Sequence, residues 1–297
     1  MSNPHLPAEM QDHVIDHLHD KPETLKQCCL VSKSWVPASR MHLFTNLKFY
    51  TPQDVQSWKK TFPDPATSPA YHTKTLYVGP QVVAAADPEV GSWVRGFPRV
   101  VHVTVGNQGL PPFESSSLVP FHGFSPAITS LRLTSVVFPS PRVFDLVTSF
   151  PLLEDLAVIA AQDLPFDDHD GSDGLWTAVQ PPNPHIFTGS LELYLKAGME
   201  RFTRRLLSLP GGIHFRKLTL TWSHEEDLVP IMALVEECSH TLESLTVTCN
   251  IVGTSIRHLR PRRSLNSISR CVEASSDRPR TSAKTQRCGV STQFARR

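Results

Sequence analysis

Short alternating segments recur along the chain at a nearly constant interval, and this repeat limits the fold more than any other feature. Each segment holds two aliphatic residues separated by one residue, and successive first members lie 27, 28, 25, 35, 27 and 27 positions apart. The pairs are Leu76/Val78, Val103/Val105, Leu131/Leu133, Leu156/Val158, Leu191/Leu193, Leu218/Leu220 and Leu245/Val247. Such alternation is typical of strands with one buried face, and the period indicates stacked repeats that bury a continuous core together.

The segments between these strands carry helix signals. Thr51-Pro52 and Ser140-Pro141 each place a capping oxygen before a first-turn proline, and apolar residues follow at helical spacing. Residues 202–209 and 228–238 show similar apolar stripes. A strand followed by a helix at a constant period predicts an α/β fold, a curved solenoid over residues 51–252 with parallel strands on one face and helices on the other. The L-x-x-L-x-L strand pattern resembles that of leucine-rich repeats in a degenerate form.

The residue between the two aliphatics of each pair should point away from the core, because side chains alternate along a strand. These outward residues are Tyr77, Thr104, Arg132, Ala157, Glu192, Thr219 and Thr246. The row is mostly polar and mixed in sign, which favours recognition of a protein over a nucleic acid. We take it as the candidate target-binding surface, although every solenoid has such a row.

Residues 6–44 are rich in apolar residues at helical spacing. Pro7 and Glu9 suit a first helical turn, and Val14, Ile15 and Leu18 then form one apolar face. A second helix is expected over residues 23–31, and its buried side is expected to consist of Leu25, Cys28, Cys29 and Val31. Trp35, Leu43 and Phe44 supply a third element. Three short helices make a marginal core, so residues 1–50 are expected to form a helical domain whose burial a partner completes.

The end of the chain differs in charge from the rest. Residues 253–297 hold eleven lysines and arginines against two acids, so this segment carries +9 and the remainder −8. Its sparse aliphatics predict a disordered basic tail, whose deletion beyond residue 272 should leave the melting temperature nearly unchanged. Because Phe294 is its only aromatic residue, base stacking has no support and nucleic acid is not an expected partner.

Other features restrict the compartment. No run of eighteen apolar residues and no secretory signal occurs, so we expect no membrane span and place the chain in the cytoplasm or nucleus. The six cysteines include no C-x-x-C pair, which favours free thiols in a reducing compartment.

The candidate metal-binding and catalytic motifs lack residues that such sites require at fixed spacings. The acidic insertion at 163–174 lacks the glycine and glutamate positions of a calcium loop, and His13 with His17 lacks the glutamate of a zinc-protease motif. Neither a nucleophile elbow nor a phosphate-binding loop occurs. We therefore expect no enzyme activity, no metal and no cofactor.

The N-terminal segment resembles the F-box family, whose pattern runs L-P-x-E, an apolar helix, then L-V-S-x-x-W. The matching pieces are Leu6-Pro7-Ala8-Glu9, Ile15 with Leu18, and Leu30-Val31-Ser32-Lys33-Ser34-Trp35. The resemblance implies docking on the Skp adaptor of a cullin-RING ubiquitin ligase. By position, it assigns the adaptor contact, or the core beneath it, to Leu6, Pro7, Glu9, Ile15, Leu18, Leu30, Val31 and Trp35.

An F-box followed by loose leucine-rich repeats resembles a class of proteins expanded in basidiomycete fungi. There the solenoid usually continues, so the departure beyond residue 272 suggests a frameshifted or alternatively spliced end. The resemblance implies a substrate-recognition subunit of an SCF-type ubiquitin ligase, which binds the Skp adaptor, through it a cullin, and an unknown target protein. The alternative is an F-box-like interaction scaffold outside a ligase.

Overall fold

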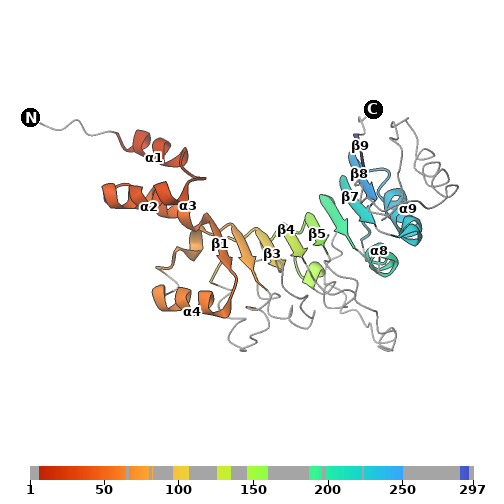
Figure 1. The fold of residues 1–297 in the computed structure, drawn as a ribbon, viewed down its shortest axis with the longest axis horizontal. Helices are drawn as coiled ribbons and strands as arrows, with labels where there is room; N and C mark the ends of the chain where they lie inside the picture. Colours follow the sequence, from red (N-terminus) through yellow and green to blue (C-terminus); the bar gives the residue numbers. More distant parts are fainter. Residues whose placement is uncertain are drawn as a thin grey trace, which may run out of the picture. The chain divides into compact units, whose positions relative to one another are not determined.

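The computed structural model describes residues 7–64, 67–79, 82, 96–106, 126–134, 146–159, 187–195, 199–209, 211–222, 224–249 and 288–293. Figure 1 shows the helices and strands in chain order. The chain divides into two compact units. The first consists of Met1–Gly106 and Ser117–Ile128, and the second of Asn107–Ser116 and Thr129–Arg297. Among the described residues, no helix is both long and apolar enough to cross a membrane.

The first unit begins with three short helices: α1 (Ala8–Asp16), α2 (Pro22–Val31) and α3 (Val36–Thr45). Pro7 precedes α1, and its carbonyl accepts the backbone N–H groups of Met10 and Gln11. Glu9 lies in the first turn, where a carboxylate complements the exposed N–H groups. Proline also stands in the first turns of α2 and α3, where its missing N–H costs no helical hydrogen bond. The prediction of three helices in this segment is confirmed.

Three parallel strands follow in the first unit: β1 (Asn46–Phe49), β2 (Thr75–Val78) and β3 (His102–Gly106). β1 was not predicted, and it begins directly after α3. The unit also contains α4 (Pro52–Thr61) and the short helix η1 (Pro69–His72). The Thr51 hydroxyl and the Asp54 carboxylate each accept the other residue's backbone N–H, so the predicted start of α4 is confirmed as a capping box.

An aromatic cluster packs the end of α3 against the first repeat. The Trp58 ring on α4 lies 5.9 Å from Phe44, 5.7 Å from Phe49 and 5.8 Å from Phe97, measured between ring centroids. The Thr73 hydroxyl also donates to the Phe44 carbonyl at 2.9 Å. The N-terminal helices are therefore joined to the first strands of this unit by packing as well as by the chain.

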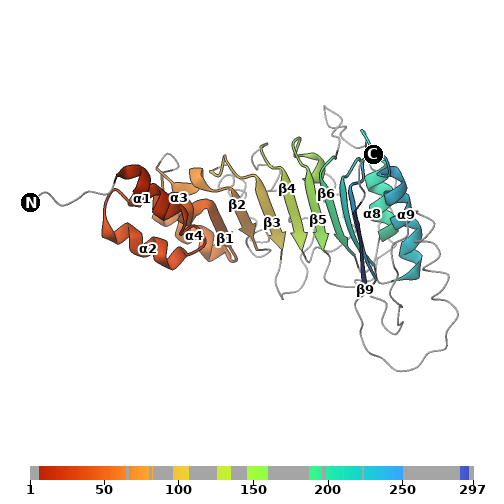
Figure 2. The ribbon, with the colours of Figure 1, turned by 90° about the horizontal axis from the view of Figure 1, so that it is seen from above.

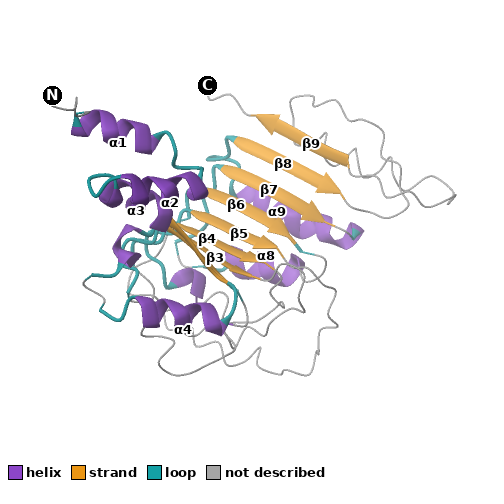
Figure 3. Cartoon of the chain, turned by 60° about the vertical axis from the view of Figure 1, so that its left-hand side comes forward, coloured by secondary structure: helices purple, strands orange, loops and turns teal. Residues whose placement is uncertain are grey.

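The second unit holds five consecutive parallel strands: β4 (Ser130–Thr134), β5 (Asp155–Ile159), β6 (Ser190–Tyr194), β7 (Lys217–Trp222) and β8 (Ser244–Cys249). Helices α8 (Met199–Leu207) and α9 (Leu228–Glu237) lie on one face of β6, β7 and β8, and the short helix η4 (Glu225–Asp227) precedes α9 (Figures 2 and 3). Six residues of the two predicted apolar stripes are buried, namely Phe202, Leu206, Ile231, Leu234, Val235 and Cys238, while Leu209 and Leu228 are half-buried.

A strand within the predicted disordered tail corrects the sequence analysis. β9 (Cys288–Gln293) pairs antiparallel with β8 over six residue pairs. The sequence gives little sign of it, because Val290 is the only aliphatic residue in the strand. Its residues pair with the edge that β8 offers, so the disordered-tail prediction is wrong for these six residues.

The predicted aliphatic pairs lie in register. In the second unit Leu131, Leu156, Leu191, Leu218 and Leu245 are successive partners across the strands. In the first unit Leu47, Leu76 and Val103 align in the same way. Both members of each predicted pair are buried except Val247, which is half-buried. The prediction of an α/β fold with parallel strands in chain order is confirmed within each unit.

A repeated hydrogen-bond pattern accompanies this register. The residue directly before one strand accepts two hydrogen bonds at its backbone carbonyl. The donors are the backbone N–H groups of the last residue before a later strand and of the first residue in that strand. Thr129 accepts from Glu154 and Asp155, at 2.8 and 2.9 Å. Gly189 accepts from Arg216 and Lys217 in the same way, at 2.8 and 3.3 Å. The polar backbone groups at the strand starts are thereby paired from one repeat to the next.

Candidate functional site

The N-terminal helices enclose a small core. Ile15, Leu25 and Cys28 are buried, and Leu18, Trp35, Ala38 and Leu43 pack against them while remaining partly exposed. Three residues assigned by the resemblance, Ile15, Leu18 and Trp35, thus contribute to this core. A change at any of them alters the folding of the helices before it alters a binding surface.

The two apolar residues at the end of α2 face solvent. The side chain of Leu30 is 83% exposed and that of Val31 is 68% exposed, so the expectation that Val31 is buried is wrong. At 3.6 residues per turn, Leu30 and Val31 both lie more than about 100° around the helix from Leu25. Packing on the Leu25 side of α2 leaves them uncovered. The end of α2 therefore presents two adjacent aliphatic side chains to solvent.

A hydrogen bond ties the turn after α2 to α1. The Ser34 hydroxyl donates to the side-chain carbonyl of Gln11 at 2.9 Å, and Gln11 is buried although it is polar. Met10 and Val14, on α1 beside Gln11, are 56% and 43% exposed. Sequence reasoning missed Met10 and placed Val14 in the apolar face with Ile15; the spacing of four residues between Met10 and Val14 was the available signal. We name Met10, Val14, Leu30 and Val31 the apolar set.

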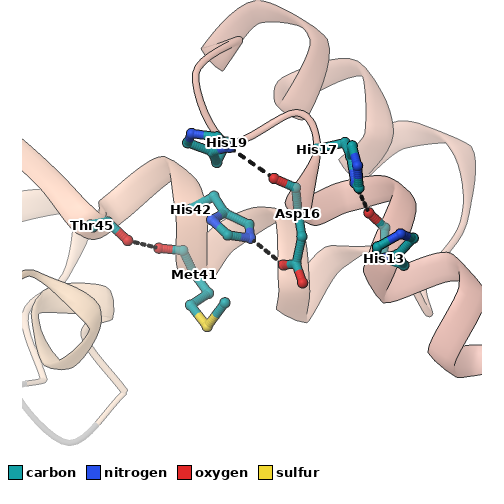
Figure 4. A network of polar contacts seen from close by, with 7 residues as sticks. All are labelled: His13, Asp16, His17, His19, Met41, His42 and Thr45. Atoms are coloured by element: carbon teal, nitrogen blue, oxygen red, sulfur yellow. Dashed lines mark hydrogen bonds and ion pairs between the residues drawn. The ribbon is translucent and has the colours of Figure 1, made fainter.

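A second polar link joins α1 to α3. The Asp16 carboxylate lies 2.8 Å from Nε2 of His42, and the Asp16 carbonyl is 2.9 Å from Nδ1 of His19 (Figure 4). The Nδ1 atom of His17 meets the His13 carbonyl at 2.8 Å. Each of these contacts joins one histidine ring to a backbone carbonyl or to the Asp16 carboxylate. Within the part of the chain that the structure describes, no three metal-binding side chains come together.

The outward row predicted from the sequence lies on the strand face opposite the buried pairs. In the second unit Arg132, Ala157, Glu192, Thr219 and Thr246 are successive partners across β4 to β8. All five are exposed or half-buried. In the first unit Tyr77 and Thr104 are partners and half-buried. The helices α8 and α9 lie on the opposite face of β6, β7 and β8, so among the described residues they leave this row uncovered (Figure 3).

One ion pair crosses this row. Two guanidinium nitrogens of Arg132 contact the two carboxylate oxygens of Glu192 at 3.0 and 3.3 Å, above the small side chain of Ala157. Both partners are half-exposed, so the pair contributes no more than about 1 kcal/mol to stability. Its charges can therefore be redirected to a bound partner at little cost. Beside it, the Asp155 carboxylate accepts from the Ser190 hydroxyl at 2.6 Å.

Tyr77 occupies the corresponding row in the first unit. Its hydroxyl donates to the Gly106 carbonyl at 2.9 Å, and its ring lies 5.1 Å from that of Tyr50. Partial burial, with a smaller contribution from Tyr50, raises the pKa of Tyr77 above its usual value. The phenol therefore stays protonated and remains a hydrogen-bond donor throughout the physiological range.

Cys28 and Cys238 are buried, whereas Cys29, which was also expected on the buried side of α2, is half-buried. Cys28 lies in the core of the N-terminal helices, and burial raises the pKa of Cys238 to about 11, with Glu237 adding to the effect and the Phe215 backbone opposing it. A thiol with this pKa is a poor nucleophile at neutral pH.

Several predicted features lie outside the described residues. These are Leu6, the helix start at 140–141, the acidic insertion at 163–174 and residues 253–287 and 294–297 of the predicted basic tail. Of the assigned adaptor residues, Pro7 and Glu9 are exposed at the start of α1. No family model matches the chain, and no curated protein matches it either.

Proposed function

We propose that the chain is the substrate-recognition subunit of an SCF-type ubiquitin ligase. In this proposal the three N-terminal helices are an F-box that docks on a Skp-type adaptor, and the strand face of a leucine-rich-repeat-like domain holds the target protein. Such a receptor catalyses no reaction. It raises the local concentration of its target near the ligase by binding two partners at once.

The exposure of Leu30 and Val31 is the observation that carries this proposal. Both residues belong to the L-V-S-x-x-W piece of the F-box pattern, and both point away from a core that three short helices leave small. A partner that covers the apolar set would add the buried area that the helices lack on their own. Ser34, the residue directly before Trp35, anchors the same piece to α1.

The strand face supplies the second contact in this proposal. Its row of hydroxyls, with the Arg132–Glu192 pair among them, offers donors, acceptors and both charge signs. This mixture suits a protein surface, where hydrogen bonds and ion pairs set orientation and specificity.

Co-purification with a Skp-type adaptor tests the first contact. We expect the full chain to retain the adaptor and Leu30→Asp to reduce retention by about tenfold or more, since a charge would replace an apolar contact. Val31→Asp should act in the same direction. Circular dichroism checks that each variant keeps its helices, which is expected because neither side chain contributes to the core.

Val229→Asp is the matched control. Val229 is 77% exposed on α9 in the second unit, so the substitution has the same chemistry at the same exposure but away from the N-terminal helices. It should retain the adaptor fully. Full retention by Leu30→Asp and Val31→Asp would remove the assigned contact, and failure of the unaltered chain to bind any Skp-type adaptor would favour the scaffold outside a ligase.

A further inference from the structure

Two cysteines occupy partner positions in the register of the last two strands of the second unit. β8 and β9 lie side by side (Figure 3). In their antiparallel register Cys249 is the Cα partner of Cys288, and the pairing continues to Ser244 and Gln293. In the sequence, 38 residues separate the two cysteines. Only the fold brings them together.

The register satisfies the backbone requirement for a disulfide. Directly opposed residues of an antiparallel pair have Cα atoms about 4.5 to 5.5 Å apart, and side chains of such partners belong to the same face of the sheet. Disulfides join residues with Cα separations of roughly 4.4 to 6.8 Å. The backbone therefore needs no rearrangement to bring these two positions within bonding range.

The strand that this bond would hold covers an unprotected edge. Each other parallel strand of the second unit carries a charged residue: Arg132, Asp155, Glu192 and Lys217. β8 has neither a charge nor a proline, and its pairing with β7 is continuous over six residues. An uncharged, regular edge of this kind is a template for pairing with other chains, and β9 occupies it.

We propose that Cys249 and Cys288 form a reversible disulfide under oxidising conditions, and that this bond locks β9 onto the edge of β8. The oxidant is a small-molecule disulfide such as oxidised glutathione. One thiolate attacks it and releases one glutathione thiol, and the second cysteine displaces the other glutathione as the intramolecular S–S bond forms. Two protons and two electrons leave the cysteine pair, and the oxidant is reduced to two thiols.

The bond acts as a modification site that reports redox state. In a reducing compartment both thiols are free and β9 is held by backbone pairing alone. Oxidation closes a loop of about 40 residues, which disfavours detached states of β9 by restricting the chain. The edge of β8 then stays covered by β9 until a reductant restores the thiols.

Titration of the full chain in glutathione buffers tests the proposal. The reduced protein is equilibrated at graded ratios of oxidised to reduced glutathione, alkylated, and mapped by mass spectrometry without reduction. We expect a peptide pair linked through Cys249 and Cys288. Cys288→Ser should abolish it, while Cys271→Ser, which removes the cysteine that lies between the two in the sequence, should leave it intact.

A variant with the cysteine moved by one residue tests whether disulfide formation requires the β8–β9 register or only that the two thiols are near each other. Cys288→Ser combined with Gly289→Cys keeps the same number of thiols but places the new one opposite Thr248. Linkage to Cys249 should then form at least about tenfold more slowly, because adjacent strand positions belong to opposite faces. This pair of substitutions replaces no buried aliphatic residue, so it is not expected to prevent folding of the strands.

Hydrogen exchange of the unaltered chain supplies an independent measurement. Oxidation should slow the exchange of the β9 amides by about tenfold or more and leave α1 to α3 unchanged. The proposal is overturned if oxidation links Cys271 to either cysteine, if both thiols remain free, if the shifted cysteine reacts as fast, or if β9 exchange is unaffected.

Discussion

The hydroxyl of Ser34 donates a hydrogen bond to the buried side chain of Gln11, and this bond places the turn after α2 against α1. Ser34→Ala removes the bond and leaves a buried acceptor with one partner fewer. We expect the adaptor affinity to fall several-fold, on the order of 1 kcal/mol, measured by calorimetric titration of the full chain. Lys33→Ala, at the exposed neighbouring position, should bind as the unaltered chain does. Equal affinities for the two variants would mean that the bond does not position the docking surface.

Gly189 approaches the preceding repeat too closely for any other residue. A Cβ atom there would lie 2.4 Å from the Glu154 carbonyl oxygen, which is backbone and cannot swing aside. Gly189→Ala should lower the free energy of unfolding by about 2 kcal/mol or more in chemical denaturation. Gly212→Ala, with a positive φ of 73° but no close neighbour, should cost about 1 kcal/mol. A loss at Gly189 no larger than that at Gly212 would contradict the close approach between repeats.

Variants of the Arg132–Glu192 pair distinguish an effect on target recognition from an effect on stability. Arg132→Glu and Glu192→Arg should each change the free energy of unfolding by less than about 1 kcal/mol, because the pair is half-exposed. The exchanged double variant restores an ion pair and the original stability. Proximity labelling in cells should nevertheless show loss of the same neighbours in all three variants, since the charge pattern facing a target is altered. If the double variant regained those neighbours, the target would not be recognised through the charges at positions 132 and 192.

Burial of Cys238 predicts a dependence of stability on alkaline pH. The folded thiol has a pKa of about 11, against 9.0 for an ordinary thiol, so the folded state holds more protons between these values. The free energy of unfolding should therefore fall as pH rises from 9 to 11, by up to about 2 kcal/mol. Subtracting the pH profile of Cys238→Ala isolates this thiol from other titrating groups. A flat difference between the two profiles would contradict the effect.

The strand register of both units could be predicted from the sequence because burial enforces it. A shift of one residue would turn Leu131, Leu156 and their partners from the core to solvent, so the aliphatic alternation fixes both the strands and their alignment. The same alternation predicted which side chains face outward. The start of α4 could also be predicted from the sequence, since Thr51 and Pro52 satisfy local hydrogen-bond requirements without help from the rest of the chain.

Other features depend on contacts that local patterns do not record. β1 holds only Leu47 and Phe49 as apolar residues and follows α3 immediately, so its strand character comes from pairing with β2. β9 depends in the same way on the edge of β8. The exposure of Val31 was mispredicted because helical spacing shows which residues share a face, but not how wide a face the neighbouring helices cover.

Hydrogen exchange of the full chain with and without a purified Skp-type adaptor tests the proposed receptor function most directly. The account predicts that the adaptor slows exchange in α1 and at the end of α2, through Ser34, while the strands β4 to β8 exchange at unchanged rates. Covering an exposed helix face restricts the local openings from which its amides exchange. Absence of protection in α1 and α2, or protection confined to the strands, would contradict the central claim that these helices are an adaptor-docking module.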